Sequence, residues 1–135
     1  MYKKILVALD ETDSAARAAR EATALANGLG AEVRFVHVGQ TREGDNALSL
    51  AKALAQGAGV NATTARVAAD GESIGDKVVH EAERWGADLI IAGRHNRTPA
   101  ERVLLGSVSA AIVRVSDLPV LIVRRVTPPA EPGGR

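Results

Sequence analysis

The chain has 135 residues, of which 46% are hydrophobic and 24% are charged, a profile typical of one globular domain with a substantial core. Its formal net charge of +1 creates no overall field for nucleic acid or an anionic membrane, and the 2% of aromatic residues is too little for a base-stacking platform. The absence of cysteine excludes disulfides, thiolate metal sites and thiol nucleophiles.

The N-terminal stretch MYKKILVALD predicts a first strand rather than a signal peptide. Its apolar run is short, ends at Asp10 and is followed by no cleavage-like site. No apolar stretch approaches the roughly 20 residues that a membrane span needs. We therefore expect a cytoplasmic protein.

In the first half of the chain, apolar runs with β-branched residues alternate with stretches of helical periodicity. The run from Lys4 to Asp10 predicts a buried parallel strand. A helix follows, in which alanines and leucines recur at helical spacing until Gly28 and Gly30 end it. Next come a strand from Glu32 to Val38, a helix capped by Asp45 or Asn46, and a weaker strand from Ala62 to Val67. The apolar stripe expected on that second helix is Leu48, Ala51, Leu54 and Ala58.

The second half continues the alternation. Ser73 is expected to cap a third helix, with Asp76 three residues on as in a capping box. Strands are predicted at 87–92 and 119–124, with a helix at 107–115 between them. The expected buried face of the third helix is Ile74, Val78, Ala82 and Trp85, and that of the fourth is Val108, Ala111, Ile112 and Val115. Residues 127–135 (TPPAEPGGR) predict a disordered tail after a domain at 1–126.

About five strands alternating with about four helices predict an α/β fold, a parallel sheet with helices on both faces. Ligands of such sheets bind beyond the carboxyl ends of the strands, where the winding reverses. Asp10 and Gly93 both lie at strand ends. If their strands are neighbours, the two residues face the same crevice.

The segment GRHNRTPAERVLLGS, residues 93–107, predicts an anion-binding loop. Gly93 lets the backbone leave the strand and lets a ligand approach it. Thr98-Pro99-Ala100-Glu101 is a second capping box, so we expect a short helix over 99–104. Gly106-Ser107 then opens a helix whose first N–H groups and dipole favour negative charge.

Side chains around this helix start strengthen the prediction. Ser107 and Ser109 offer hydroxyl donors, and four cationic side chains lie in the same segment: Arg94, His95, Arg97 and Arg102. The simplest ligand is a phosphate chain. No lysine precedes the serine as in a Walker loop.

These residues resemble the universal stress protein family. Its nucleotide-binding members carry Gly, two residues, Gly, nine residues and then Gly-Ser or Gly-Thr; here Gly93 and Gly106-Ser107 match, and Asn96 replaces the second glycine. The resemblance extends over nearly the whole chain, through KILVALD, FVHV, GADLIIAGRHNR, LLGSVSAAIVR and DLPVLIVRR.

The resemblance implies a sheet order of 3-2-1-4-5 and an ATP site, with Mg²⁺ carried by the phosphates. Asp10 would contact the adenosine moiety, and backbone near Ala8 and Val38 would border adenine. The resemblance and the anion-binding features of residues 93–107 together predict the nucleotide-binding residues. These are Ala8, Leu9, Asp10, Val38, Gly93, His95, Asn96, Arg97, Gly106, Ser107, Val108 and Ser109.

Asn96 leaves two alternatives open. If the position needs positive φ, Asn is the least costly replacement for Gly. If backbone must touch phosphate there, the Asn side chain obstructs, although its amide could also donate to phosphate.

The remaining polar residues have simpler interpretations. His37 is expected to be partly buried in an inner strand, and His80 to face solvent on a helix. The histidine spacing supports no metal site. Ser107 lacks a nucleophile elbow, so a hydrolase triad is disfavoured. Trp85 is expected in the core.

The last strand predicts a homodimer, because an apolar edge strand needs a cover; the alternative is that the tail of the same chain covers it. The resemblance supplies one, an antiparallel pairing across a two-fold axis through Val120, Leu121, Ile122 and Val123. Two functions follow. The first is a dimeric stress-response protein in which ATP biases conformation or the choice of an unidentified protein partner, with at most slow hydrolysis because no general base can be assigned. The second is a dimeric interaction module without nucleotide.

Overall fold

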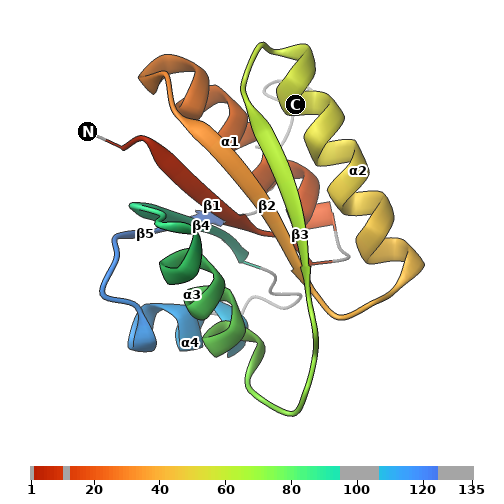
Figure 1. Ribbon diagram of the computed structural model, residues 1–135, viewed down its shortest axis with the longest axis vertical. Coiled ribbons are helices and arrows are strands. Elements are labelled where there is room, and N and C mark those ends of the chain that lie inside the picture. Colours follow the sequence, from red (N-terminus) through yellow and green to blue (C-terminus); the bar gives the residue numbers. More distant parts are fainter. Residues whose placement is uncertain (1, 11–12, 95–106, 125–135) are drawn as a thin grey trace, which may run out of the picture.

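The computed structural model describes residues 2–10, 13–94 and 107–124, which form five strands and four helices (Figure 1). The strands are β1 (Lys4–Ala8), β2 (Glu32–Val38), β3 (Ala62–Val67), β4 (Leu89–Arg94) and β5 (Val120–Arg124). The helices are α1 (Asp13–Leu29), α2 (Arg42–Gly57), α3 (Ile74–Trp85) and α4 (Ser107–Val115).

The strands form one parallel sheet in the order β3-β2-β1-β4-β5. Side chains of β1 alternate between its two faces, as a buried strand requires. Ile5 and Val7 pack into the core beneath α1 and α2, whereas Leu6 packs into the core beneath α3. The predicted α/β class and sheet order are thereby confirmed, with two helices on each face (Figure 1).

The start of α2 differs from the prediction. The helix begins at Arg42, and its N-cap is Thr41, whose Oγ1 accepts a hydrogen bond of 3.0 Å from the Gly44 N–H. Asp45 and Asn46 therefore lie inside the helix. Gly44 therefore lies in the first turn of the helix, and a glycine is needed there because the His37 ring packs against it.

The buried stripes of three helices are also narrower than expected. In α2 the buried residues are Gly44, Leu48, Ala51 and Ala55, while Leu54 is 41% exposed and Ala58 is exposed. In α3, Ile74 is 46% exposed although Val78 and Ala82 are buried. In α4, Val115 is exposed at the last turn. These residues lie at helix ends or at the borders of the apolar stripes, away from the centre of the helix face that packs on the sheet.

Trp85 packs against the core but is only partly buried, whereas the sequence predicted it inside the core. Its ring is half-buried at the end of α3, with Lys4 Nζ 4.7 Å and Arg34 Cζ 4.9 Å from the ring centroid. Arg34 also forms an ion pair with the buried Glu81, with Nη1 3.1 Å from Oε2. Cations over an indole face are favourable, so this tryptophan is stabilised by cation–π contacts.

Candidate functional site

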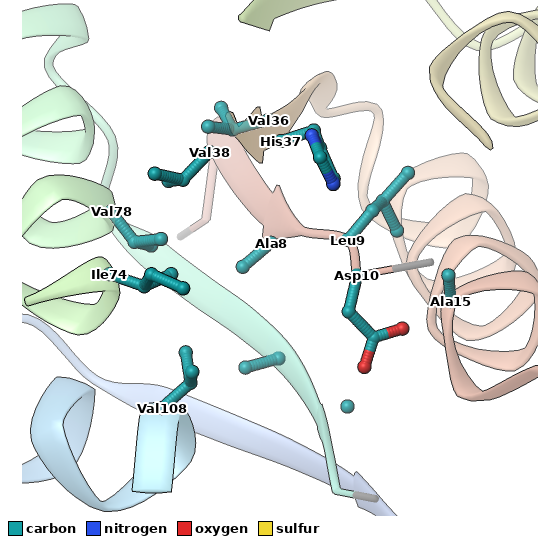
Figure 2. A pocket seen from close by; sticks show the side chains of 12 residues that line it. Ala8, Leu9, Asp10, Ala15, Val36, His37, Val38, Ile74, Val78 and Val108 are labelled. Carbon is teal, nitrogen blue, oxygen red and sulfur yellow. The ribbon is translucent and has the colours of Figure 1, made fainter. Parts of the chain in front are cut away.

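A cavity of about 370 Å³ opens at the carboxyl edge of the sheet (Figure 2). We call it the sheet-edge cavity. It lies where β1, β2 and β4 end and where α3 and α4 begin. Its lining residues are Ala8, Leu9, Asp10, Ala15, Val36, His37, Val38, Ile74, Val78, Ala92, Gly93 and Val108.

Strand register brings the segments of this cavity together. Ala8 at the end of β1 pairs with Val36 on one side and Ala92 on the other. The backbone remains paired just past the strand, because the Leu9 N–H donates to the Val36 carbonyl at 2.9 Å. β1 is followed by α1 on one face of the sheet, while β4 is followed by α4 on the other. The cavity therefore occupies the switch point of the winding, where such sheets bind ligands.

One side of the sheet-edge cavity is an apolar wall. Figure 2 shows the side chains of Val38, Val78, Ile74 and Val108 gathered on this side, from β2, α3 and α4. Ile74 is exposed on the helix yet lines the cavity, which explains why an apolar residue stays outside the core. A wall of aliphatic side chains suits a flat, weakly polar ring.

The two helices of this wall are held at close range by a glycine. A Cβ on Gly75 would overlap the Ala111 Cβ and would lie 3.1 Å from both the Val108 carbonyl oxygen and the Ile112 nitrogen. Gly75 therefore lets the start of α3 approach α4. Ile74 precedes Gly75 in the chain, and Val108 provides one of the contacting carbonyl groups. The distance between α3 and α4 therefore fixes the width of the apolar wall.

The loop before α3 is fixed by an ion pair. Lys77 Nζ lies 2.7 Å from Asp70 Oδ2 and 3.9 Å from Glu72 Oε2. This hydrogen bond lowers the pKa of Asp70 and raises the pKa of Lys77. Ser73 confirms its predicted role, because its Oγ accepts a hydrogen bond of 3.2 Å from the Asp76 N–H. These contacts set where α3 begins, and hence where Ile74 lies.

Polar groups lie at the other side of the cavity. Asp10 is exposed, and its carboxylate extends from the end of β1 away from Ile74 and Val78 (Figure 2). Gly93 lies at the end of β4, one strand away. Its carbonyl accepts a hydrogen bond of 2.9 Å from the Ser109 hydroxyl, which is buried in the first turn of α4. The Ser109 proton is thus used to fix α4 against β4.

Several sequence predictions converge on this cavity. Ala8, Leu9, Asp10, Val38, Gly93 and Val108 all line it. Ser107 is the first residue of α4, whose initial N–H groups have no acceptor within the helix itself. His95, Asn96, Arg97 and Gly106 lie outside the described residues, as do the short helix expected over 99–104 and the tail at 127–135.

Sequence reasoning missed part of the lining, namely Ala15, Val36, His37, Ile74, Val78 and Ala92. His37 was expected to be partly buried, and it is 5% exposed, with Nδ1 3.3 Å from the Gly39 carbonyl oxygen. Its position second from the end of β2 is the signal that could have placed it at the cavity. Ile74 and Val78 gave no such signal, because their contact with the site depends on how α3 packs.

The described residues bring together no group of three or more histidine, aspartate or glutamate side chains that could hold a metal ion. Within the same residues, no helix is both long enough and apolar enough to cross a membrane.

Comparison with known proteins identifies the family. The model of the universal stress protein family matches residues 1–124, and the chain belongs to this family. Universal stress protein YxiE of Bacillus subtilis is 32% identical, over 92% of this chain and 100% of that protein.

Two solved structures are similar and contain nucleotides. A universal stress protein in complex with cAMP is 29% identical, with a TM-score of 0.76 over 93% of this chain and 98% of that one. The Archaeoglobus fulgidus protein in complex with dAMP is 25% identical, with a TM-score of 0.72 over 90% of this chain and 97% of that one.

Proposed function

We propose that this chain is a nucleotide-binding member of its family and that the sheet-edge cavity binds ATP. The observation that carries the proposal is the combination, in one cavity, of an aliphatic wall, an exposed carboxylate and the start of a helix. Its volume of about 370 Å³ falls within the range of small-molecule sites. The similar proteins in complex with cAMP and dAMP support an adenine nucleotide as the ligand class.

The chemistry of the lining suggests an orientation. Adenine would lie against Val38 and Ile74, bordered by backbone at Ala8, and the Asp10 carboxylate would accept a hydrogen bond from the adenosine part. The phosphates would then approach Gly93 and the first N–H groups of α4 at Ser107 and Val108, where the helix dipole favours anions. His95, Asn96, Arg97 and Gly106 would complete this end. Mg²⁺ would be carried by the phosphates.

In this proposal the nucleotide is a regulator of a dimeric stress-response protein in the cytoplasm. Bound ATP would bias the conformation of the chain or its choice of protein partner. Hydrolysis is not part of the proposal, because no described side chain near the cavity can be assigned as a base for water attack on the phosphate end.

Thermal unfolding across ATP concentration tests the proposal. A ligand that binds only the folded chain stabilises it by RT ln(1 + [L]/Kd), about 2.7 kcal/mol at a hundredfold excess over Kd. We expect a rise in Tm with ATP, a smaller rise with GTP, and loss of the ATP effect in Asp10→Ala. Glu21→Ala, which removes an exposed acid from α1, is the matched control and should respond as the natural chain does.

The alternative is an interaction module that binds no nucleotide. It predicts no change in Tm at millimolar ATP. If ATP does not change the Tm, the variant Asn96→Gly separates two causes of that result. A gain of ATP response in this variant would identify the Asn96 side chain as the obstacle, and no gain would favour the module.

We also propose that the chain forms a homodimer through β5. This strand pairs with β4 on one side only, among the described residues, and Leu121 is 43% exposed on it. Val120, Leu121, Ile122 and Val123 would pair with their copies across a two-fold axis. Leu121→Glu would place a carboxylate in that contact, and sedimentation should then detect weaker association than in the natural chain.

A further inference from the structure

A second hollow lies on the outer side of α1 and α2. We call it the α1–α2 groove; its volume is about 480 Å³. Its lining residues are Ala15, Ala16, Ala19, Arg20, Glu43, Asn46, Ala47, Leu50, Ala51 and Leu54.

The groove exposes apolar side chains that the core does not use. α2 turns Leu48, Ala51 and Ala55 toward the sheet, whereas Leu50 is 73% exposed and Leu54 is 41% exposed. A single exposed leucine is ordinary on a protein surface. Here two leucines stand beside a floor of alanines, of which Ala15, Ala19 and Ala51 are buried core residues, and the low charge of this region is typical of the centre of a protein interface.

The shape of the groove fits a second copy of the same face. Ala16 is exposed on the α1 wall, with the buried Ala15 and Ala19 beneath it, and small residues let helices pack at short interaxial distances. Leu50 projects from the α2 wall and provides a side chain that such a trough could accept. A two-fold axis would place the Leu50 of each copy against the alanines of the other, because a two-fold contact uses the same patch twice.

The charged residues of the groove on one copy are complementary to those of the same groove on a second copy. Among the described residues, Arg20 on the α1 wall and Glu43 on the α2 wall are the charged ones that line the groove, and both are exposed. They have opposite signs, lie on different helices and form no ion pair with another described residue. The same two-fold contact would bring Arg20 of one copy toward Glu43 of its partner.

We propose that the α1–α2 groove is a surface through which two copies of this chain associate. It is distinct from the β5 edge, because its lining residues all belong to α1 and α2 and none belongs to β5 (Figure 1). The proposal does not depend on ATP, and its test is made without nucleotide.

Sedimentation velocity over a range of concentrations tests this surface with the full chain. The measurements are made both in the natural chain and in Leu121→Glu, so that association through β5 is separated from association through the groove. Arg20→Glu leaves acids on both walls, and Glu43→Arg leaves arginines on both walls. We expect each variant alone to associate at least about tenfold more weakly, because like charges then face each other.

An equimolar mixture of the two charge variants is the decisive sample. Each chain then meets a partner of opposite charge on both walls, so association should recover to near the natural level. In the Leu121→Glu background, Leu50→Glu should abolish association without changing the circular dichroism spectrum or Tm, since the Leu50 side chain is largely outside the core. The proposal is overturned if Leu121→Glu sediments as a monomer at every concentration, if the mixture does not recover, or if Leu50→Glu has no effect.

Discussion

His37 is the residue that links the sheet-edge cavity to α2. Its ring is buried, lines the cavity and packs against Gly44 in the first turn of the helix. Gly44 is held there by its own N–H, which donates to the Thr41 hydroxyl. The position of the imidazole is therefore set by backbone from β2 and α2 together. A substitution at Gly44 should move the His37 ring and change the shape of the cavity.

Gly44→Ala should weaken ATP binding several-fold and destabilise the fold by about 1–3 kcal/mol, the usual cost of overpacking. The added Cβ would overlap the His37 ring, so the ring must move toward the cavity or α2 must move outward. Calorimetric titration with ATP and urea unfolding measure the two effects.

Gly57→Ala is the matched control, because it lies in the same helix with nothing within 4 Å of the new Cβ. It should leave both quantities nearly unchanged. The double variant His37→Ala with Gly44→Ala removes the overlap and should recover part of the lost stability. Equal effects of Gly44→Ala and Gly57→Ala would contradict this account of His37.

The pKa of Asp70 gives a second prediction for single residues. The hydrogen bond from Lys77 holds this pKa below its ordinary value of 3.8. A carboxyl whose folded pKa is lowered contributes stability above its unfolded pKa, and this contribution is lost as the pH falls through the folded pKa. The Asp70 carboxylate is exposed to solvent, so the effect on stability is small.

Lys77→Gln should therefore raise the pKa of Asp70 toward 3.8. A titration of the Asp70 side-chain carbon by NMR measures this, with Glu21 as an exposed reference. An Asp70 pKa that is the same in the natural chain and in Lys77→Gln would show that the ion pair does not form in solution.

Among the secondary-structure elements, α3 and α4 depend most on one close contact. Gly75 meets Ala111, and the aliphatic wall of the cavity lies next to this contact. Helix pairs at such short distance tolerate no extra methyl group without moving apart.

Gly75→Ala should destabilise the chain by about 1–3 kcal/mol, and Gly75→Val by more, because the helices must separate. The urea midpoint measures this. Gly28→Ala, in the last turn of α1 with nothing within 4 Å of the new Cβ, should be neutral or stabilising by up to about 1 kcal/mol. A Gly75→Ala midpoint equal to that of Gly28→Ala would contradict the proposed close contact.

The elements themselves were largely predictable, because buried parallel strands leave continuous apolar runs and helices leave periodic ones. The start of α2 was not, because Gly44 serves a contact with His37 that has no local signature. Trp85 was also misplaced, since its contacts with Lys4 and Arg34 join residues far apart in sequence. Strand ends located Asp10 and Gly93 at the site, but Ile74 and Val78 required the packing of α3.

At the scale of the whole molecule, the sheet order creates the site. β1 lies at the centre, so the end of its strand meets the ends of β2 and β4, and helices from opposite faces begin beside it. Residues separated by about a hundred positions, such as Ala8 and Val108, line one cavity only in this winding. The proposed regulatory role rests on that cavity holding a nucleotide.

The most direct test is a titration of the isotope-labelled chain with ATP and Mg²⁺, followed by amide NMR. We expect saturable chemical-shift changes at Asp10, Val38 and Gly93 and in the first turn of α4. The amide signals of Asn27 and Asn61, which lie near the amino ends of the strands, should not change. No shifts at millimolar ATP, or shifts centred on Asn27 and Asn61, would contradict the assignment of the sheet-edge cavity as a nucleotide site.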